Sequence, residues 1–273
     1  MSTTHSKRRS IVTSILLFLI VFGLWQAYDL ALNYVSLPSL LITILTYFAI
    51  YAASLIILVL FIKLGKSSFK EHGFKEPAHV RKNVLLSVAF TLIYIIIMVI
   101  PGFLFGFTSR SVPEFFTIIL NISRAILIAV TTEFIFRGYI FRNLTRNHGF
   151  FISLYASSIM FSLHTYESPI SIMTLLTMNT NEIITDILFQ QVASVFTAGL
   201  FLGFMFYKMD WSLLGPIIFR IGTLLSFYFM PLVAKSPWWM GLTFEVIAYV
   251  CLIVTVDSVI KEPIYRRRKY GLE

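Results

Sequence analysis

The stretch Thr132–Tyr139, which reads TEFIFRGY, places charged residues inside a long apolar segment that begins near Phe115. Glu133 and Arg137 are four residues apart, so they share one face of an α-helix and can pair. Ionisable residues are costly inside a membrane helix and usually mark function there. The stretch therefore predicts a membrane helix that carries a polar site, either an active catalytic site or the remains of one.

The composition of the whole chain also indicates a membrane protein. The 273 residues are 58% hydrophobic and only 13% charged, and the mean hydropathy is +0.83. A soluble domain has about 25% charged residues. Because this apolar surplus exceeds what one water-soluble core can bury, we expect a single all-α integral membrane domain over residues 1–273 in a lipid bilayer.

Eight segments reach or approach the roughly 20 apolar residues that a spanning helix needs. They are Ile11–Tyr34, Leu40–Leu64, Asn83–Phe107, Phe115–Ile140, Phe150–Tyr166 or beyond, Ile183–Tyr207, Trp211–Val233 and Trp238–Ile260. Pro169 is placed to kink the fifth segment, and Ile170–Met178 either extends it or forms a re-entrant piece.

The basic residues predict the orientation of these spans. Of the 22 Lys and Arg residues, 17 fall in one set of alternate loops, and only Arg110 and Lys235 fall in the opposite set. The positive-inside rule then places both termini in the cytoplasm. It also accounts for the net charge of +9 without a nucleic-acid partner. Lys7–Arg9 precede an apolar segment of full spanning length with no clear cleavage site, so we expect this first span to be retained.

Few side chains within the spans can perform acid–base chemistry. His164 is the only histidine inside a predicted span, and together with Glu133 it supplies the minimum for activating water. The same residues also suit a structural network in which Glu133 neutralises Arg137. Arg220 and Glu245 are ionisable groups of the seventh and eighth spans. A catalytic zinc needs three protein ligands, and no ligand-spaced motif is present, so we expect no metal and no cofactor.

Several stretches resemble the motifs of the CPBP family, the CAAX-protease and bacteriocin-processing membrane proteins. Glu133–Tyr139 resembles the first motif, in which two adjacent glutamates are followed by three residues and an arginine. Met160–His164 resembles the second, a phenylalanine and then a histidine in the next span. Gly199–Gly203 and Gly215–Arg220 resemble the approach to the third. The resemblance covers about residues 115–225, and it implies an eight-span fold and an intramembrane endopeptidase as the family's activity.

Important family positions hold other residues in this chain. In the family, the first glutamate of the pair activates water together with the second-motif histidine, and the corresponding position here is Thr132. The third motif usually offers a histidine and, four residues on, an asparagine for the oxyanion; here these positions are Arg220 and Leu224. The phenylalanine expected four residues before the histidine is replaced by Met160, and Phe161 is one residue closer.

These departures favour a degenerate family member. Thr132 does not ionise at neutral pH, so it cannot serve as the general base, and the loss of a base or of an oxyanion donor each costs about 10²–10⁴-fold in rate. The resemblance then implies a non-catalytic scaffold or regulator in a bacterial plasma membrane. Its partner would be a membrane protein in cell-envelope enzymology, surface-protein processing, or bacteriocin or lysin immunity. The small residues Ala156–Ser158 are a candidate partner-binding face, or they serve internal packing.

Two alternatives to the scaffold remain. In the first, Glu133 and His164 form a rearranged site in an active intramembrane endopeptidase, and Arg137, Arg220, Thr132 and Glu245 have structural roles. Arg220 either stabilises an oxyanion or pairs with Glu133 or Glu245. In the second alternative the protein is a transporter, which the absence of an internal repeat disfavours.

Overall fold

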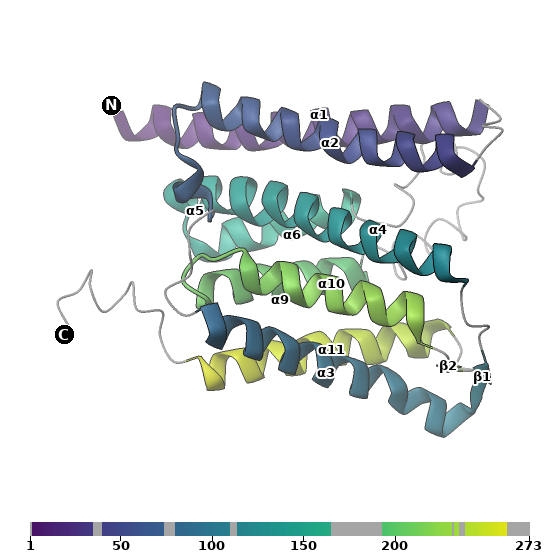
Figure 1. Ribbon diagram of the computed structural model, residues 1–273. Coiled ribbons are helices and arrows are strands. Elements are labelled where there is room, and N and C mark those ends of the chain that lie inside the picture. The colour runs from purple at the N-terminus through teal and green to yellow at the C-terminus, as the bar shows by residue number, and fades with distance from the viewer. Residues whose placement is uncertain are drawn as a thin grey trace. The chain divides into compact units, whose positions relative to one another are not determined.

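The computed structural model describes residues 2–34, 40–73, 80–109, 114–164, 193–230, 232–234 and 238–260. Helices dominate these residues, as Figure 1 shows. The α-helices are α1 (Ser2–Tyr34), α2 (Leu40–Leu64), α3 (Val80–Phe105), α4 (Phe115–Glu133), α5 (Arg142–His148), α6 (Phe150–His164), α9 (Ser194–Lys208), α10 (Leu214–Phe229) and α11 (Trp238–Val259). A 3₁₀-helix, η1 (Phe69–His72), and a π-helix, η2 (Phe134–Phe141), complete the helical elements. Pro169 and the predicted piece Ile170–Met178 lie outside the described residues.

The helices have the length and composition of membrane segments. Four described stretches are long and apolar enough to cross a bilayer, namely Arg8–Tyr28, Val80–Phe105, Phe115–His148 and Met240–Val259, and four shorter apolar helices accompany them. Large apolar side chains remain exposed, with Phe103 at 78% and Phe115 at 77%. Because water-soluble monomers rarely expose apolar surface on this scale, a helical membrane protein is confirmed. The number of spans and the side on which each terminus lies stay predictions.

The predicted span boundaries agree best with the observed helices where the apolar residues and the helix end at the same position. The bounds of α2 are those predicted, Leu40–Leu64, and the chain turns immediately afterwards. In contrast, α1 begins at Ser2 instead of Ile11, and the helical path of the fourth segment continues beyond Ile140 through α5. The apolar residues of a segment indicate only the part of a helix that lipid can cover. The backbone hydrogen bonds of the helix can continue into the polar residues on either side, so the helix is longer than its apolar part.

A short antiparallel ribbon is the one described feature that departs from an all-helical chain. Strand β1 (Phe107–Ser109) pairs with strand β2 (Leu232–Ala234), with Thr108 opposite Val233. Gly106 has a φ of 85°, which is strained for other residues, and it turns the chain from α3 into β1. Strands of three residues are too short to produce a readable alternation in the sequence.

The chain divides into two compact units. Unit 1 consists of Met1–His72 and Phe134–Gly199, and unit 2 consists of Gly73–Glu133 and Leu200–Glu273. One border between them falls between Glu133 and Phe134, inside the charged stretch Thr132–Tyr139. Glu133 therefore belongs to unit 2, and Arg137 belongs to unit 1.

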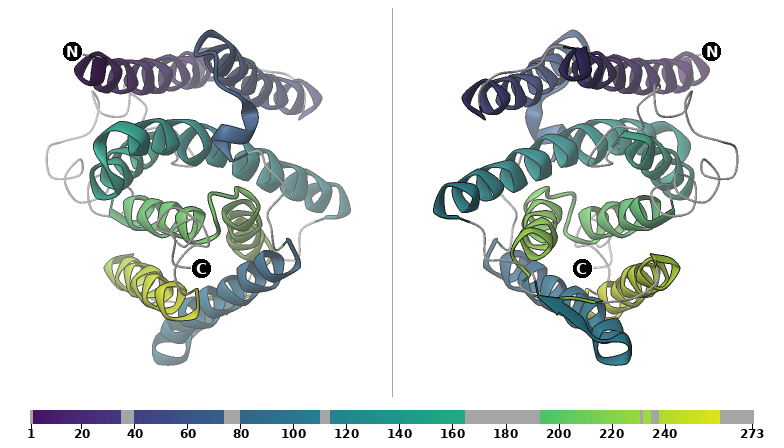
Figure 2. Two further views of the ribbon diagram at one scale, coloured as in Figure 1. Left: turned by 90° about the vertical axis from the view of Figure 1, so that its left-hand side faces the viewer. Right: turned by 90° about the vertical axis from the view of Figure 1, so that its right-hand side faces the viewer.

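In unit 1, α1 lies along α2 and also packs against α5, which in turn contacts η2 and α6 (Figure 2). Two polar ties hold α1 in place. The Asn143 Nδ2 group of α5 donates to the Ser10 carbonyl at 3.0 Å and to Thr13 Oγ1 at 3.1 Å. Further along α1, Trp25 Nε1 donates to Ser54 Oγ of α2 at 3.3 Å.

In unit 2, α3 packs against α10 and α11, and α10 also packs against α4. The approach of α3 to α10 is close, because a Cβ atom at Gly222 would lie 2.5 Å from Thr91 Cγ2. Phe201 and Phe219 pack edge to face with their ring centroids 4.7 Å apart. These contacts fix the helix that carries the third-motif positions.

Candidate functional site

The first motif lies in a π-helix. Helix η2 covers Phe134–Phe141 and follows directly on Glu133, the last residue of α4. The prediction of one shared face for Glu133 and Arg137 assumes α-helical spacing, and this assumption is wrong from Phe134 onward. In a π-helix the backbone bonds join residues five apart, which changes the neighbours on each face. Single π turns within α-helices occur frequently at functional sites.

Arg137 is the centre of the site within unit 1. Its side chain is only 1% exposed. One terminal nitrogen donates to the Gly199 carbonyl of α9 at 3.2 Å, and the guanidinium carbon lies 3.8 Å from the centroid of the Phe161 ring of α6. Residues from all three motif regions therefore meet at this guanidinium. A cation over an aromatic ring is worth about 2 kcal/mol when both are desolvated.

His164, the last residue of α6, lies beside this cluster. Its side chain is 6% exposed, and its ring centroid is 5.4 Å from that of Phe136 in η2 and 5.7 Å from that of Trp25 in α1. Phe136 also packs on Phe161 at 5.5 Å, which links His164 to the ring under Arg137. Among the described residues, Nδ1 of His164 has no hydrogen-bond partner.

Trp25 and His72 also belong to the site, although no motif in the sequence includes them. Trp25 packs against His164. Tryptophans of membrane helices are usually found at the interfaces, so the position of Trp25 well inside a predicted span is the one feature of the sequence that marks it as unusual. His72 of η1 is 2% exposed. Its Nδ1 donates to the Gly138 carbonyl at 3.0 Å, its ring stacks on Tyr139 at 5.0 Å, and Ser67 Oγ lies 2.8 Å from Nε2. A loop histidine thus holds the first-motif π-helix.

We expect His72 to make the stability of the protein depend on pH. Burial lowers the pKa of His72 below its usual 6.5, and the nearby Arg146 acts in the same direction. The unfolded chain therefore binds more protons than the folded chain below about pH 6.5, and stability falls as the pH drops through this range. Melting temperatures measured from pH 8 to pH 5 should decline less in His72→Gln than in the wild type.

Neighbouring charges and a second histidine allow this effect to be assigned. The hydrogen bond from Arg146 lowers the pKa of Glu71. The stability that the ionised Glu71 contributes is therefore lost at a lower pH than the range in which His72 acts. His148→Gln, which removes a different histidine on α5, is measured over the same pH range as a control for the loss of a histidine side chain. Parallel slopes for the wild type and His72→Gln would contradict the assignment.

In unit 2, the side chains at the paired-glutamate positions are buried. Thr132 is 4% exposed and Glu133 is fully buried. The Thr132 hydroxyl donates to the Ile128 carbonyl one turn earlier at 2.7 Å, and more weakly to the Ala129 carbonyl at 3.5 Å. The hydroxyl at the position of the family's first glutamate therefore bonds to its own helix.

The third-motif positions also lie in unit 2, on α10. Arg220 is partly buried, and its backbone carbonyl accepts a hydrogen bond from Thr223 Oγ1 at 3.0 Å. Leu224 is 8% exposed and offers no hydrogen-bonding side chain. Glu245 of α11 accepts a hydrogen bond from the Tyr94 hydroxyl of α3 at 3.3 Å. The pairing of Arg220 with Glu133 or Glu245 stays a prediction.

Unit 1 thus brings Arg137 and His164 to either side of two packed phenylalanines, and unit 2 contains Thr132, Glu133 and the third-motif positions. Because Glu133 and Arg137 belong to different units, their ion pair and a cavity shared with His164 stay predictions. The described residues contain no group of three His, Cys, Asp or Glu side chains that could hold a metal. Ser157 and Ser158 are buried at 2% and 1% exposure, which favours internal packing for this stretch.

Comparison with known proteins supports the motif assignment. Residues 113–225 match the family model described as type II CAAX prenyl endopeptidase Rce1-like. The resemblance to the CPBP family is confirmed. The matched range includes all the motif stretches, from Glu133 to Arg220. No curated protein matches the chain.

Within this CPBP-type region the residues of the motifs fall into two groups. Arg137, Phe161 and Gly199 form a buried contact that supports the helices, whatever chemistry the region performs. The resemblance of the motifs assigns Thr132, Arg220 and Leu224 to the positions of the family's catalytic carboxylate and oxyanion donors, and these three assignments stay predictions. Over residues 113–225 the chain is similar to an intramembrane protease family.

Proposed function

We propose that this protein is a non-catalytic member of the CPBP family. It acts as a membrane scaffold or regulator of a cell-envelope enzyme, of surface-protein processing, or of bacteriocin or lysin immunity. It is a multi-pass protein of a bacterial plasma membrane with both termini in the cytoplasm, as the distribution of basic residues predicts. The observation that carries the proposal is the Thr132 hydroxyl, which donates to the Ile128 carbonyl at 2.7 Å.

Two chemical arguments support the loss of catalysis. A threonine hydroxyl lacks the basicity of a carboxylate, and the Thr132 hydroxyl directs its proton to the Ile128 carbonyl of its own helix. The general base is therefore absent at this position. Glu133 is the next residue, but adjacent positions of a helix differ by about 100° around the axis. Leu224, at the position of the family's asparagine, has no hydrogen-bond donor in its side chain, which removes a second contribution of similar size.

The alternative is an active glutamic-type endopeptidase that uses Glu133 and His164. The observation in its favour is the retention of His164 with an Nδ1 that has no partner among the described residues. A histidine general base needs one ring nitrogen available to take a proton. Glu133 would then act as the carboxylate of a rearranged site.

Complementation separates these two functions. A deletion strain carries either the wild-type gene or a Glu133→Gln, His164→Ala double variant, and the membrane level of each protein is measured. We expect the variant to restore the deletion phenotype fully, because a scaffold needs no reacting groups. Failure of the variant at normal abundance would overturn the scaffold and favour the endopeptidase.

A matched control is available in the same chain. Glu114→Gln with His148→Ala makes the same two chemical changes at an exposed glutamate before α4 and at a histidine in α5. This control should complement under either function. It therefore distinguishes loss of the motif groups from a general response to changed charge.

A further inference from the structure

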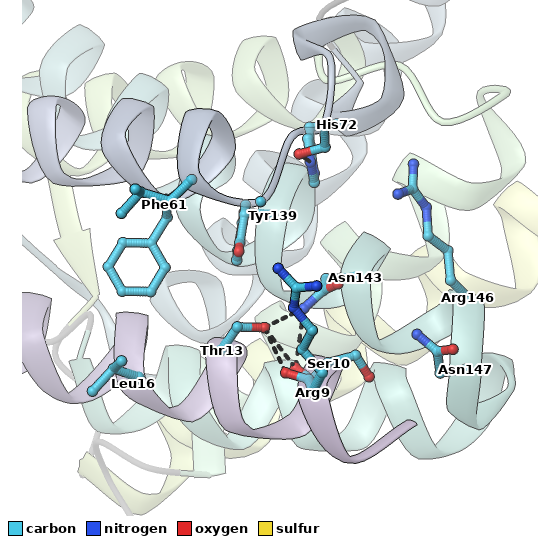
Figure 3. Close-up of a pocket in the computed structure, with 13 residues that line it drawn as sticks. Arg9, Ser10, Thr13, Leu16, Phe61, His72, Tyr139, Asn143, Arg146 and Asn147 are labelled. Atoms are coloured by element: carbon cyan, nitrogen blue, oxygen red, sulfur yellow. Dashed lines mark hydrogen bonds between the residues drawn. The ribbon is translucent and has the colours of Figure 1, made fainter. Parts of the chain in front are cut away.

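A cavity of about 470 Å³ lies within unit 1 (Figure 3), and neither Arg137 nor His164 lines it. Its walls come from the first part of α1, the end of α2, and from η1, η2 and α5. Cavities of about 300–1,000 Å³ accommodate small organic ligands. Its lining includes His72, which holds the first-motif π-helix, and Tyr139 of that helix, but none of the side chains considered for catalysis.

Two guanidinium groups give the cavity its charge. Arg9 of α1 and Arg146 of α5 both line it. Arg146 donates to Glu71 Oε2 at 2.7 Å, which uses part of the five-donor fork of its side chain. Among the described residues, no carboxylate is paired with Arg9. The lining therefore has a surplus of positive charge together with guanidinium donors suited to phosphate oxygens.

The wall between these arginines is held in place by hydrogen bonds. Asn143 Nδ2 lies within 3.0 Å of the Ser10 carbonyl and 3.1 Å of Thr13 Oγ1, and Thr13 Oγ1 donates to the Arg9 carbonyl at 2.9 Å. Figure 3 shows this network at the base of Arg9. A ligand would meet a wall that is already ordered, which reduces the entropic cost of binding.

The other end of the cavity is apolar and faces outward. Leu16, Phe61 and Leu64 line it, and Figure 3 shows Phe61 and Leu16 on the opposite side from Arg146 and Asn147. Leu16 is 48% exposed and Leu64 is 75% exposed. Leu16 lies about two turns further into the apolar part of α1 than Arg9. A ligand that fills the whole cavity therefore needs an anionic end and an apolar end.

We propose that this cavity binds one anionic phospholipid, with its phosphate between Arg9 and Arg146 and its acyl chains along Leu16, Phe61 and Leu64. The cavity is at the end of α1 and α2 that the basic residues predict to be cytoplasmic. Basic pockets between membrane helices on that side are suited to anionic lipid headgroups. The lipid would hold α1, α2 and α5 together as an additional component of unit 1.

Native mass spectrometry of the full chain in detergent tests the proposal. Phosphatidylglycerol and phosphatidylcholine with identical acyl chains are titrated onto the protein, and glycerol 3-phosphate forms a third arm without acyl chains. We expect the wild type to retain phosphatidylglycerol at about tenfold lower concentration than phosphatidylcholine. Both lipids offer a phosphate to the two guanidinium groups, but the choline ammonium of phosphatidylcholine adds a positive charge beside them. Equal retention of both lipids, or equally strong binding of glycerol 3-phosphate, would overturn it.

Charge-matched variants assign the binding to this cavity. Arg9→Gln with Arg146→Gln removes both guanidinium groups, whereas Arg8→Gln with Arg142→Gln removes two neighbouring charges that do not line the cavity. The first variant should lose the preference for phosphatidylglycerol, and the second should keep it. An equal loss in both would refute the site. Arg9→Gln alone leaves the pair of Arg146 with Glu71 intact and should still weaken the preference, even if the double variant folds poorly.

Discussion

Replacing Arg137 by alanine should lower the free energy of unfolding by about 3 kcal/mol, since a charged hydrogen bond and a buried cation–π contact are lost together. The guanidinium joins η2 to α9 through the Gly199 carbonyl and to α6 through the Phe161 ring. We therefore expect lower membrane abundance and a lower melting temperature in mild detergent. The stability of Arg137→Lys should fall between that of the wild type and that of Arg137→Ala. The lysine ammonium keeps the positive charge but cannot stack as a planar group on the Phe161 ring.

Arg142→Ala is the matched control for this experiment. Arg142 follows five residues later, and its Nε donates to the Glu71 carbonyl at 3.2 Å in a partly exposed position. Exposed contacts of this kind contribute about 0–1 kcal/mol, so this variant should stay close to the wild type. Wild-type abundance and melting of Arg137→Ala would contradict a supporting role for the motif arginine.

Gly199→Ala should destabilise unit 1 by about 1–3 kcal/mol, the usual cost of forcing extra atoms into a packed interior. A Cβ atom at Gly199 would lie 2.9 Å from Ser158 Cβ and 3.1 Å from Ser158 Cα, so the backbone of α6 has to move. The same residue supplies the carbonyl that Arg137 binds. Thermal melting in detergent should show a clear decrease.

Two further variants make the result specific. Gly241→Ala places the same methyl group in open space on α11, and there the better helix propensity of alanine should leave stability unchanged or slightly higher. Ser158→Gly removes the atom that the new methyl meets, so it should recover part of the loss in a double-mutant cycle. A Gly199→Ala protein as stable as the wild type would show that the helices do not need this close approach.

The apolar pattern predicts the helical membrane fold well, because lipid-covered helices need long apolar runs. It predicts α2 at its full bounds, but not the start of α1 at Ser2 or the ribbon of β1 and β2. It also misses the π-helix at Phe134–Phe141. Each backbone hydrogen bond of a π-helix reaches one residue further than that of an α-helix. The residues of Phe134–Phe141, which are apolar and aromatic except for Arg137 and Gly138, do not reveal which spacing the backbone adopts.

In the candidate site, too, the sequence predicts features of single positions but not the contacts between residues far apart in the chain. Motif spacing predicts the importance of Arg137 and His164 and the replacement at Thr132, because these are statements about single positions. It gives no sign that His72 bonds to the Gly138 carbonyl or that Trp25 packs on His164. Those contacts join residues far apart in the sequence, and no periodicity relates them.

A comparison of protein termini in cell membranes tests the absence of proteolysis most directly. Mass spectrometry would quantify new termini in a deletion strain that carries the wild type, the Glu133→Gln, His164→Ala variant, or the Glu114→Gln, His148→Ala control. The proposed non-catalytic role predicts the same set of termini in all three. A terminus that forms with the wild type and the control, but not with the motif variant, would contradict this role and identify a substrate.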